Sequence, residues 1–310
     1  AGVAVGGFFV ISGFLLTWSL DRNPDLKAFA LKRFFRIYPL YAVVILIQAV
    51  VLVAEVGTLR GGIATELLRY LGANLVFANF LQPTIGETLA GLRLDAINGS
   101  AWTLKVEIAC YIALPFVLAA QRRLGIAFTA GLALLLAGYP LLSGGAGGPH
   151  AAIYLGLASF FLTGSLLYRW GHHLDRYQAL FLPLGIVGAP LVVLGASSVM
   201  RVPIGAQVVV GLWVYCVAFA GRTIAVKDDI SYGAYLLHFP LIQLGLLHGL
   251  LFDEVLLSTA LVVLATTALA WLSFRHLERP MIRLGHRLSR EWPPRDLRSH
   301  RGSPDPGESR

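Results

Sequence analysis

The chain has 310 residues, of which 56% are hydrophobic and only 14% are charged, and its formal net charge is +8. Ordinary soluble domains carry about 25% charged residues, and a compact soluble core cannot hide this much apolar surface. The composition therefore excludes a soluble globular enzyme, a disordered chain and a disulfide scaffold, and it indicates a membrane protein.

Apolar runs long enough to cross a bilayer recur along the chain, and each is expected to be helical because unpaired backbone groups are too costly in lipid. A polar loop at 21–36 follows the first run. A shorter run at 67–82 is interrupted by Gly72, Asn74 and Asn79, so we interpret it as re-entrant or interfacial. The spanning runs are predicted at 3–20, 38–56, 101–120, 125–142, 151–168, 178–199, 203–221, 230–251 and 255–274.

The basic residues fall mainly on one of the two sides that this pattern defines. Of the 25 Lys and Arg residues, 20 lie on the side of the first polar loop and the C-terminal tail, and 4 lie on the other. Cytoplasmic loops carry such an excess, so the net charge points to membrane topology and not to nucleic acid. The sequence predicts an all-α, polytopic helix bundle with nine visible spans, a membrane domain at 1–285 and a disordered, basic cytoplasmic tail at 286–310.

Two segments near the start could bind an anion. Ser12 lies in an apolar, glycine-containing segment, and Arg33 and Arg36 share one face of a helix because they are three residues apart. Guanidinium groups match phosphate oxygens, so a phosphate clamp is one interpretation. Ordinary anchoring at the membrane surface is the other, with Tyr38 and Pro39 at the interface and Pro39 in a first helical turn.

A further segment, Asn98–Glu107, places polar groups at the start of a later span. Ser100 is a plausible N-cap, and Lys105 and Glu107 are too close in sequence to pair on one helix face. Glu107 lies about two turns into the span, where an ionisable group indicates function. A structural ion pair inside the bundle is the alternative.

Two later segments contain further ionisable groups at membrane depth or at its edge. Tyr235 and His238 are three residues apart and share a helix face, although a membrane histidine is often only a packed, hydrogen-bonded residue. At the end of the last run, Glu278 is expected to pair with a neighbouring arginine in an interfacial anchor.

Five segments resemble, in the same order, the membrane acyltransferase-3 family of bacterial O-acyltransferases: FFVISGFLLT, RFFRIYPLY, NGSAWTLKVEIACYIALP, SYGAYLLHFPLI and FRHLERPMIRLG. The resemblance covers about residues 1–285 and implies a bundle of about ten spans in the bacterial inner membrane, with a cytoplasmic C-terminus. It implies transfer of an acyl group, often acetyl, from cytoplasmic acyl-CoA to a hydroxyl of a carbohydrate, glycolipid or macrolide acceptor. Acyl-CoA is then a co-substrate, and neither a permanently bound cofactor nor a metal is expected.

The resemblance also implies roles for particular residues. Arg33 and Arg36 would hold CoA phosphates, and Trp102, with Glu107, would face the acceptor or brace the pore. The implied catalytic residues are Glu107 and His238, and the implied substrate-binding residues are Ser12, Arg33, Arg36, Tyr38, Trp102, Lys105 and Tyr235.

One family feature has no counterpart in this chain. The family's first span carries a basic residue followed by a histidine thought to act in catalysis, and no such pair precedes Gly7. We therefore expect the general base upstream of Ala1, with His238 shaping the pocket, and we expect the given chain alone to be unable to complete the chemistry. A transporter or flippase of sugars or lipids is the alternative function, although such proteins often show repeated halves and none is apparent in this sequence.

Overall fold

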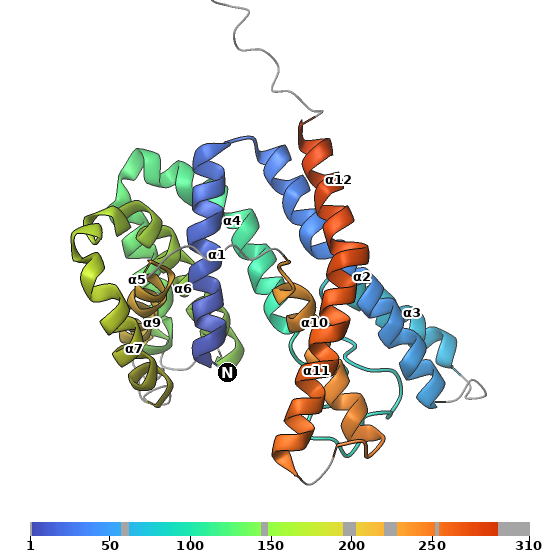
Figure 1. Cartoon of the computed structure of the whole chain (residues 1–310). Coiled ribbons are helices and arrows are strands. Elements are labelled where there is room, and N and C mark those ends of the chain that lie inside the picture. Colours follow the sequence, from blue (N-terminus) through green and yellow to red (C-terminus); the bar gives the residue numbers. More distant parts are fainter. Residues whose placement is uncertain are drawn as a thin grey trace, which may run out of the picture.

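The computed structural model describes residues 2–56, 62–143, 148–194, 203–219, 228–251 and 254–290. Within these ranges the regular structure is entirely helical, which confirms the all-α class (Figure 1). The helices are α1 (Gly2–Arg22), α2 (Leu26–Val56), α3 (Ile63–Leu75), α4 (Trp102–Leu124), α5 (Ile126–Leu142), α6 (Gly148–Trp170), η1 (Gly171–His173), η2 (Asp175–Tyr177), α7 (Gln178–Leu194), α9 (Pro203–Phe219), α10 (Ser231–Leu247), α11 (Val255–Ser273), η3 (Phe274–Glu278) and α12 (Arg279–Arg290).

Five helical segments of the described chain have the length and composition of membrane spans. Three further apolar helices among the described residues are shorter, at Ile126–Leu142, Ala179–Gly188 and Gly205–Phe219. The chain is thus a helical membrane protein, and the count of nine spans stays a prediction. The five segments of the described chain that are long and apolar enough to cross a bilayer are Gly2–Arg22, Leu26–Val56, Trp102–Leu124, His150–His173 and Val255–Arg290.

The helices form two groups with α1 and α4 between them (Figure 1). In one group α6 packs against α1, α5 and α9, and α7 packs against α9. In the other, α12 packs along α2, and α10 packs against α11. The turn from α1 to α2 and the C-terminal end of α12 lie at the same end of the molecule. The boundary between the groups is where the candidate site lies.

The contact between α1 and α6 depends on two glycines. A Cβ atom added to Gly13 would lie 1.8 Å from the carbonyl oxygen of Phe161, and one added to Gly164 would lie 1.9 Å from that of Val10. Small residues allow two helix backbones to approach closely where lipid supplies little driving force for association. These glycines therefore fix the position of α1, which forms one wall of the site.

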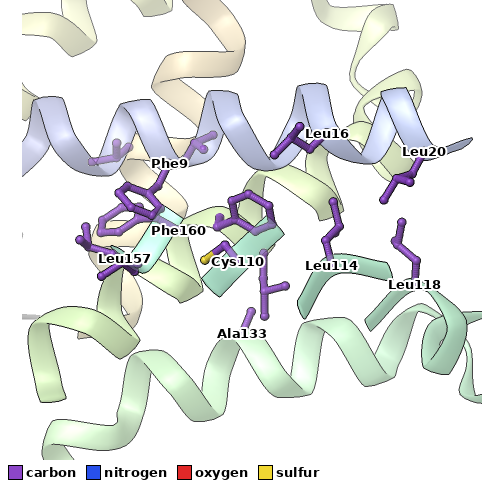
Figure 2. Packing of buried hydrophobic residues seen from close by; sticks show 14 of the residues in the cluster. Phe9, Leu16, Leu20, Cys110, Leu114, Leu118, Ala133, Leu157 and Phe160 are labelled. Atoms are coloured by element: carbon purple, nitrogen blue, oxygen red, sulfur yellow. The ribbon is translucent and has the colours of Figure 1, made fainter. Parts of the chain in front are cut away.

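Buried apolar side chains fill the space below α1 (Figure 2). They come from α1, α2, α4, α5, α6 and α9 and make one continuous cluster. Burial of this cluster holds α4 against α1, and α4 carries several residues of the site. The residues labelled in Figure 2 are Phe9, Leu16, Leu20, Cys110, Leu114, Leu118, Ala133, Leu157 and Phe160.

The second helix begins earlier than the sequence pattern predicts. The expected loop at 21–36 is confined to residues 23–25, because α1 continues to Arg22 and α2 starts at Leu26. The Asp25 Oδ1 atom accepts hydrogen bonds from the backbone N–H groups two and three residues further on, at 2.9 and 3.2 Å, and so caps the helix. Pro39 consequently lies inside a long helix and not in its first turn, contrary to our expectation.

The segment at 67–82 is partly helical. Helix α3 ends at Leu75, and the chain then runs irregularly to the start of α4. Asn74 is buried at this end, and its Nδ2 donates to the carbonyl oxygens of Tyr70 and Gln82 at 2.9 and 2.8 Å. These bonds fold the irregular segment back against α3, which is not among the helices long enough to span.

The last span continues into a further helix. A π-helical turn at Phe274–Glu278 leads directly into α12, which ends at Arg290. Residues 286–290 are therefore helical, unlike the disordered tail that we expected from residue 286. The remainder of that predicted tail, 291–310, lies outside the described residues.

Candidate active site

A cavity of about 550 Å³ lies between α1, α2, α4 and α10, and we call it the arginine cavity. It gathers residues from three motifs that are far apart in the sequence, as well as Asp229, which precedes α10. Each of the four helices contributes at least one sequence-predicted residue, and these residues are Ser12, Arg33, Arg36, Glu107 and Tyr235. The polar lining consists of Ser12, Arg33, Arg36, Thr103, Glu107, Tyr111, Asp229, Ser231, Tyr232 and Tyr235.

Arg36 is held by two carboxylates. Its Nη2 atom lies 2.6 Å from Asp229 Oδ2, and its Nη1 atom lies 3.7 Å from Glu278 Oε2. Glu278 is 1% exposed and accepts a hydrogen bond from Ser273 Oγ at 3.0 Å. We expected Glu278 to pair with an arginine of its own segment, but in the described chain its ionic partner is Arg36, on α2. A planar guanidinium fixed on one side presents its remaining N–H donors in a defined direction.

Asp229 keeps its negative charge beside Arg36. Burial alone would raise the pKa of its carboxyl group, but the hydrogen bonds from Ser231 and the charge of Arg36 outweigh burial and hold the pKa below its ordinary value. The Ser231 hydroxyl donates to Asp229 Oδ1 at 2.6 Å. The ion pair at this end of the cavity is therefore charged at neutral pH.

Arg33 is the second cation of the arginine cavity. Its Nε atom is buried and has no hydrogen-bond partner among the described residues. A buried donor left without a partner costs about 1–3 kcal/mol. The Arg33 side chain thus offers a free donor in the wall of the cavity, as a ligand-binding residue would.

Glu107 lies deep in the arginine cavity and is 6% exposed. The Tyr111 hydroxyl donates a hydrogen bond to its Oε1 atom, and the charges of Arg33 and Arg36 act on its carboxylate. Lys105 lines a different cavity, in line with the expectation that it does not pair with Glu107. The carboxylate is therefore placed between a hydroxyl donor and the arginine charges.

The motif that begins at Asn98 docks on α10 where that helix contains a proline. Pro240 has no N–H group, so the carbonyl of Leu236 lacks its helical partner, and Asn98 Nδ2 donates to that carbonyl at 3.0 Å. The Tyr235 hydroxyl donates to the carbonyl oxygen of Ser100 at 2.7 Å. The two motifs thus form one unit, and a local defect in α10 provides the docking point.

Ser100 is not the N-cap that we expected. Ala101 is the residue at the helix start, and no side chain caps it. The Ser100 hydroxyl instead lies 2.6 Å from Asn98 Oδ1 and 3.3 Å from the carbonyl oxygen of Tyr235. Its side chain therefore joins the two motifs and does not terminate the helix.

A second cavity, of about 620 Å³, adjoins the first, and we call it the histidine cavity because His238 lines it. The two cavities share Thr103 and Tyr235, whose hydroxyl groups contact each other. His238 Nδ1 lies 2.8 Å from the carbonyl oxygen of Tyr235 and 3.2 Å from that of Ala234. Carbonyl oxygens only accept hydrogen bonds, so in the neutral ring Nδ1 carries the proton and Nε2 has the free lone pair.

A third cavity, of about 490 Å³, shares Gly99 and Trp102 with the histidine cavity. We call it the lysine cavity, because Lys105 lines it. The three cavities thus follow one another through the bundle. Trp102 lines both the histidine cavity and the lysine cavity, and it does not line the arginine cavity.

Tyr38 is the predicted site residue that the structure leaves outside these three cavities. It lines an apolar groove between α2 and α4. Its ring stacks on Phe34, with the ring centroids 5.0 Å apart and the planes at 17°. This position suits an aromatic residue that packs at the helix surface.

Five polar residues of the arginine cavity were not predicted as site residues from the sequence: Thr103, Tyr111, Asp229, Ser231 and Tyr232. Asp229 and Ser231 are two residues apart just before a helix, which is a recognisable helix-start signal. Thr103 carried no comparable signal, because a single threonine in an apolar run has many possible partners. Its importance follows from its place at the boundary between two cavities.

Comparison with known proteins gives a family for this arrangement. The arrangement is a helical membrane bundle in which basic, carboxylate and histidine groups line three adjacent cavities. A family model described as an acyltransferase domain matches residues 1–275. The chain belongs to this acyltransferase-3 family, so the resemblance drawn from the five sequence segments is confirmed.

Two curated relatives match part of the chain. Acyltransferase MdmB of Streptomyces mycarofaciens is 34% identical over 119 residues, which cover 36% of this chain and 27% of the relative. Nodulation protein 10 of Rhizobium leguminosarum bv. viciae is 34% identical over 129 residues, which cover 39% of this chain and 34% of the relative. The matches thus span about a third or less of each relative's length. No solved structure matches the chain.

Proposed function

We propose that this protein transfers an acyl group from acyl-CoA to a hydroxyl group of a carbohydrate-type acceptor across the bacterial inner membrane. The arginine cavity would receive the donor on the cytoplasmic side. The C-terminus would lie on that same side. The transferred acyl group would be acetyl. The single observation that carries the proposal is the series of three adjacent cavities, with two arginines in the first, a histidine in the second and a lysine in the third.

The donor end is supported by charge and by an unsatisfied donor. Arg36 is oriented by Asp229 and Glu278, and Arg33 has a buried N–H group without a partner. Phosphate groups of CoA would use these guanidinium donors in charge-assisted hydrogen bonds. Glu107 would act as a positioning residue that keeps Arg33 directed at the donor.

The chemistry requires a base near the boundary between the first two cavities. We propose that His238, which lines the histidine cavity, supplies it in place of the base that we expected upstream of Ala1. The acceptor hydroxyl would lose its proton to Nε2 of His238 as its oxygen bonds to the thioester carbonyl carbon. Collapse of the tetrahedral intermediate would break the C–S bond, and the departing CoA sulfur would take up the proton from the imidazolium. The contact of His238 Nδ1 with two carbonyls supports this role because it favours the tautomer with a free Nε2.

Replacement of His238 tests the proposal most specifically. In protein purified into lipid nanodiscs, we expect His238→Gln to lower kcat with acetyl-CoA by about 10²–10⁴-fold, the range for loss of a general base. We expect Glu107→Gln to raise the donor KM and to lower kcat less. His248→Gln is the matched control, because His248 lies at the end of the same helix and pairs with Glu55 at 3.0 Å. Equal kcat for wild type and His238→Gln would refute the assigned base.

A further inference from the structure

The lysine cavity contains polar groups that the proposed chemistry does not use. Its walls come from α2, from the irregular segment before α4, from the first turn of α4 and from the start of α6. The histidine cavity lies between the lysine cavity and the arginine cavity, where the donor is proposed to bind. A lysine, two amide side chains and two aromatic rings in its lining indicate what kind of ligand the lysine cavity binds.

Lys105 is a cation in an unfavourable place. Its ammonium lies 4.4 Å from the ring centroid of Phe80 and 4.6 Å from that of Tyr154. It lies in the first turn of α4, where the helix dipole disfavours positive charge. No carboxylate in the described part of the chain forms an ion pair with it. A negative group in the cavity would offset both costs.

Two amide side chains in the walls lack hydrogen-bond partners. Gln48 is 4% exposed; its Oε1 accepts from the Tyr70 hydroxyl at 3.1 Å, while its Nε2 has no partner among the described residues. The buried Oδ1 atom of Asn79 is also without one. Exchanging the two amide atoms of Gln48 would still leave one unsatisfied. The cavity wall therefore holds at least one free donor or acceptor from each amide, and hydroxyl groups can serve both kinds.

Aromatic rings complete the lining. Trp102 and Tyr154 lie with ring centroids 5.8 Å apart and planes at 32°, and both line the lysine cavity. Pockets for small ligands combine such apolar surfaces with a few polar groups that fix orientation. A ring that carries hydroxyl groups and one negative charge matches this combination.

We propose that the lysine cavity binds an acidic saccharide as the acyl acceptor. The sugar ring lies against Trp102, its hydroxyl groups bond to Gln48 and Asn79, and its carboxylate or phosphate group faces Lys105. The lysine and histidine cavities adjoin at Gly99 and Trp102, so a neighbouring hydroxyl of the sugar would enter the histidine cavity there. The role as acceptor rests on the proposed function, whereas the binding itself does not.

Calorimetric titration without acyl-CoA tests the binding separately from catalysis. The probes are trigalacturonic acid for a carboxylate, glucose 6-phosphate for a phosphate, and maltotriose as the neutral sugar. We expect at least one acidic probe to bind at least tenfold more tightly than maltotriose, and the stronger of the two identifies the anionic group. Failure of both acidic probes to bind more tightly than maltotriose would overturn the proposal.

Variants locate the bound sugar. We expect Lys105→Met to weaken binding of the acidic probe at least tenfold and Lys105→Arg to retain most of it, while Gln48→Met weakens acidic and neutral sugars alike. Lys32→Met, on α2 outside the cavity, is the control. Thermal unfolding checks that each variant is folded. Equal affinities for Lys105→Met and Lys32→Met would place the sugar elsewhere. Intact binding together with absent acyl transfer would contradict only the proposed function.

Discussion

At the scale of single residues, the two arginines of the arginine cavity have different surroundings. Arg36 neutralises Glu278, which is almost completely buried, so its loss would leave a buried carboxylate unpaired. Arg33 has no ion pair with a described carboxylate and a free Nε donor. Arg33 is therefore the cleaner probe of donor binding, because its replacement disturbs fewer structural contacts.

We predict that Arg33→Ala raises the KM for acyl-CoA by about 10- to 150-fold, which corresponds to the loss of one charge-assisted hydrogen bond of about 1.5–3 kcal/mol. Arg33→Lys should recover only part of this loss, since a point charge cannot form a forked contact. Steady-state kinetics with varied acyl-CoA measures the effect. Arg169→Ala, which removes a pair with Asp21 at 3.0 Å outside the cavity, is the control. An unchanged donor KM for Arg33→Ala would favour the anchoring interpretation.

At the scale of helices, the position of α1 depends on close backbone contact with α6. Gly13 touches the backbone of Phe161. Near it, the Thr17 hydroxyl donates to Ser165 Oγ at 2.8 Å, which adds a buried hydrogen bond between the same helices. Since α1 also forms a wall of the arginine cavity, a shift of α1 would change the site as well as the packing.

We predict that Gly13→Ala destabilises the protein by about 1–3 kcal/mol, the usual cost of overpacking a well-packed contact. Gly131→Ala in α5 is the matched control, because nothing lies within 4 Å of a Cβ atom added there. Thermal unfolding in one detergent compares the two. Similar midpoints for both variants would show that α1 and α6 are less closely packed than described.

The elements also show what the sequence could predict. Apolar runs of membrane length located most helices, because lipid forces such runs to be helical. The beginning of α2 and the whole of α12 were missed because they are charged helices outside those runs. The cap formed by Asp25 and the π-helical turn before Arg279 extend helical structure beyond the apolar sequence.

For the site, the motifs predicted much of the arginine cavity. Arg33 and Arg36, which we expected in a polar loop, line it from α2 together with Glu107 of α4. Gln48 and Asp229 could not be assigned from the sequence, since a single polar residue does not reveal which distant helix faces it. Tyr38 lines a neighbouring groove together with Arg33, so its contact with a substrate stays a prediction.

At the scale of the whole molecule, the turn from α1 to α2 and the C-terminal end of α10 lie at opposite ends of the bundle (Figure 1). Asn23 belongs to that turn, and the exposed Leu250 follows α10. The excess of basic residues predicts that the Asn23 end is cytoplasmic. Asn23→Cys should thus resist a membrane-impermeant maleimide in intact cells, and Leu250→Cys should react. The native Cys110 and Cys216 are buried and should give little background. Labelling at position 23 and not at 250 would reverse the proposed orientation.

The proposed function of the whole protein is acyl transfer from CoA to a sugar hydroxyl. The most direct measurement incubates nanodiscs containing the protein with acetyl-CoA labelled in the acetyl group and the acidic saccharide that binds most tightly. We predict label in the saccharide as an alkali-labile ester, dependent on His238 and equal in amount to the CoA released. If the wild-type protein produced no labelled saccharide, or if His238→Gln produced as much as the wild type, the proposed acyl transfer through His238 would be contradicted.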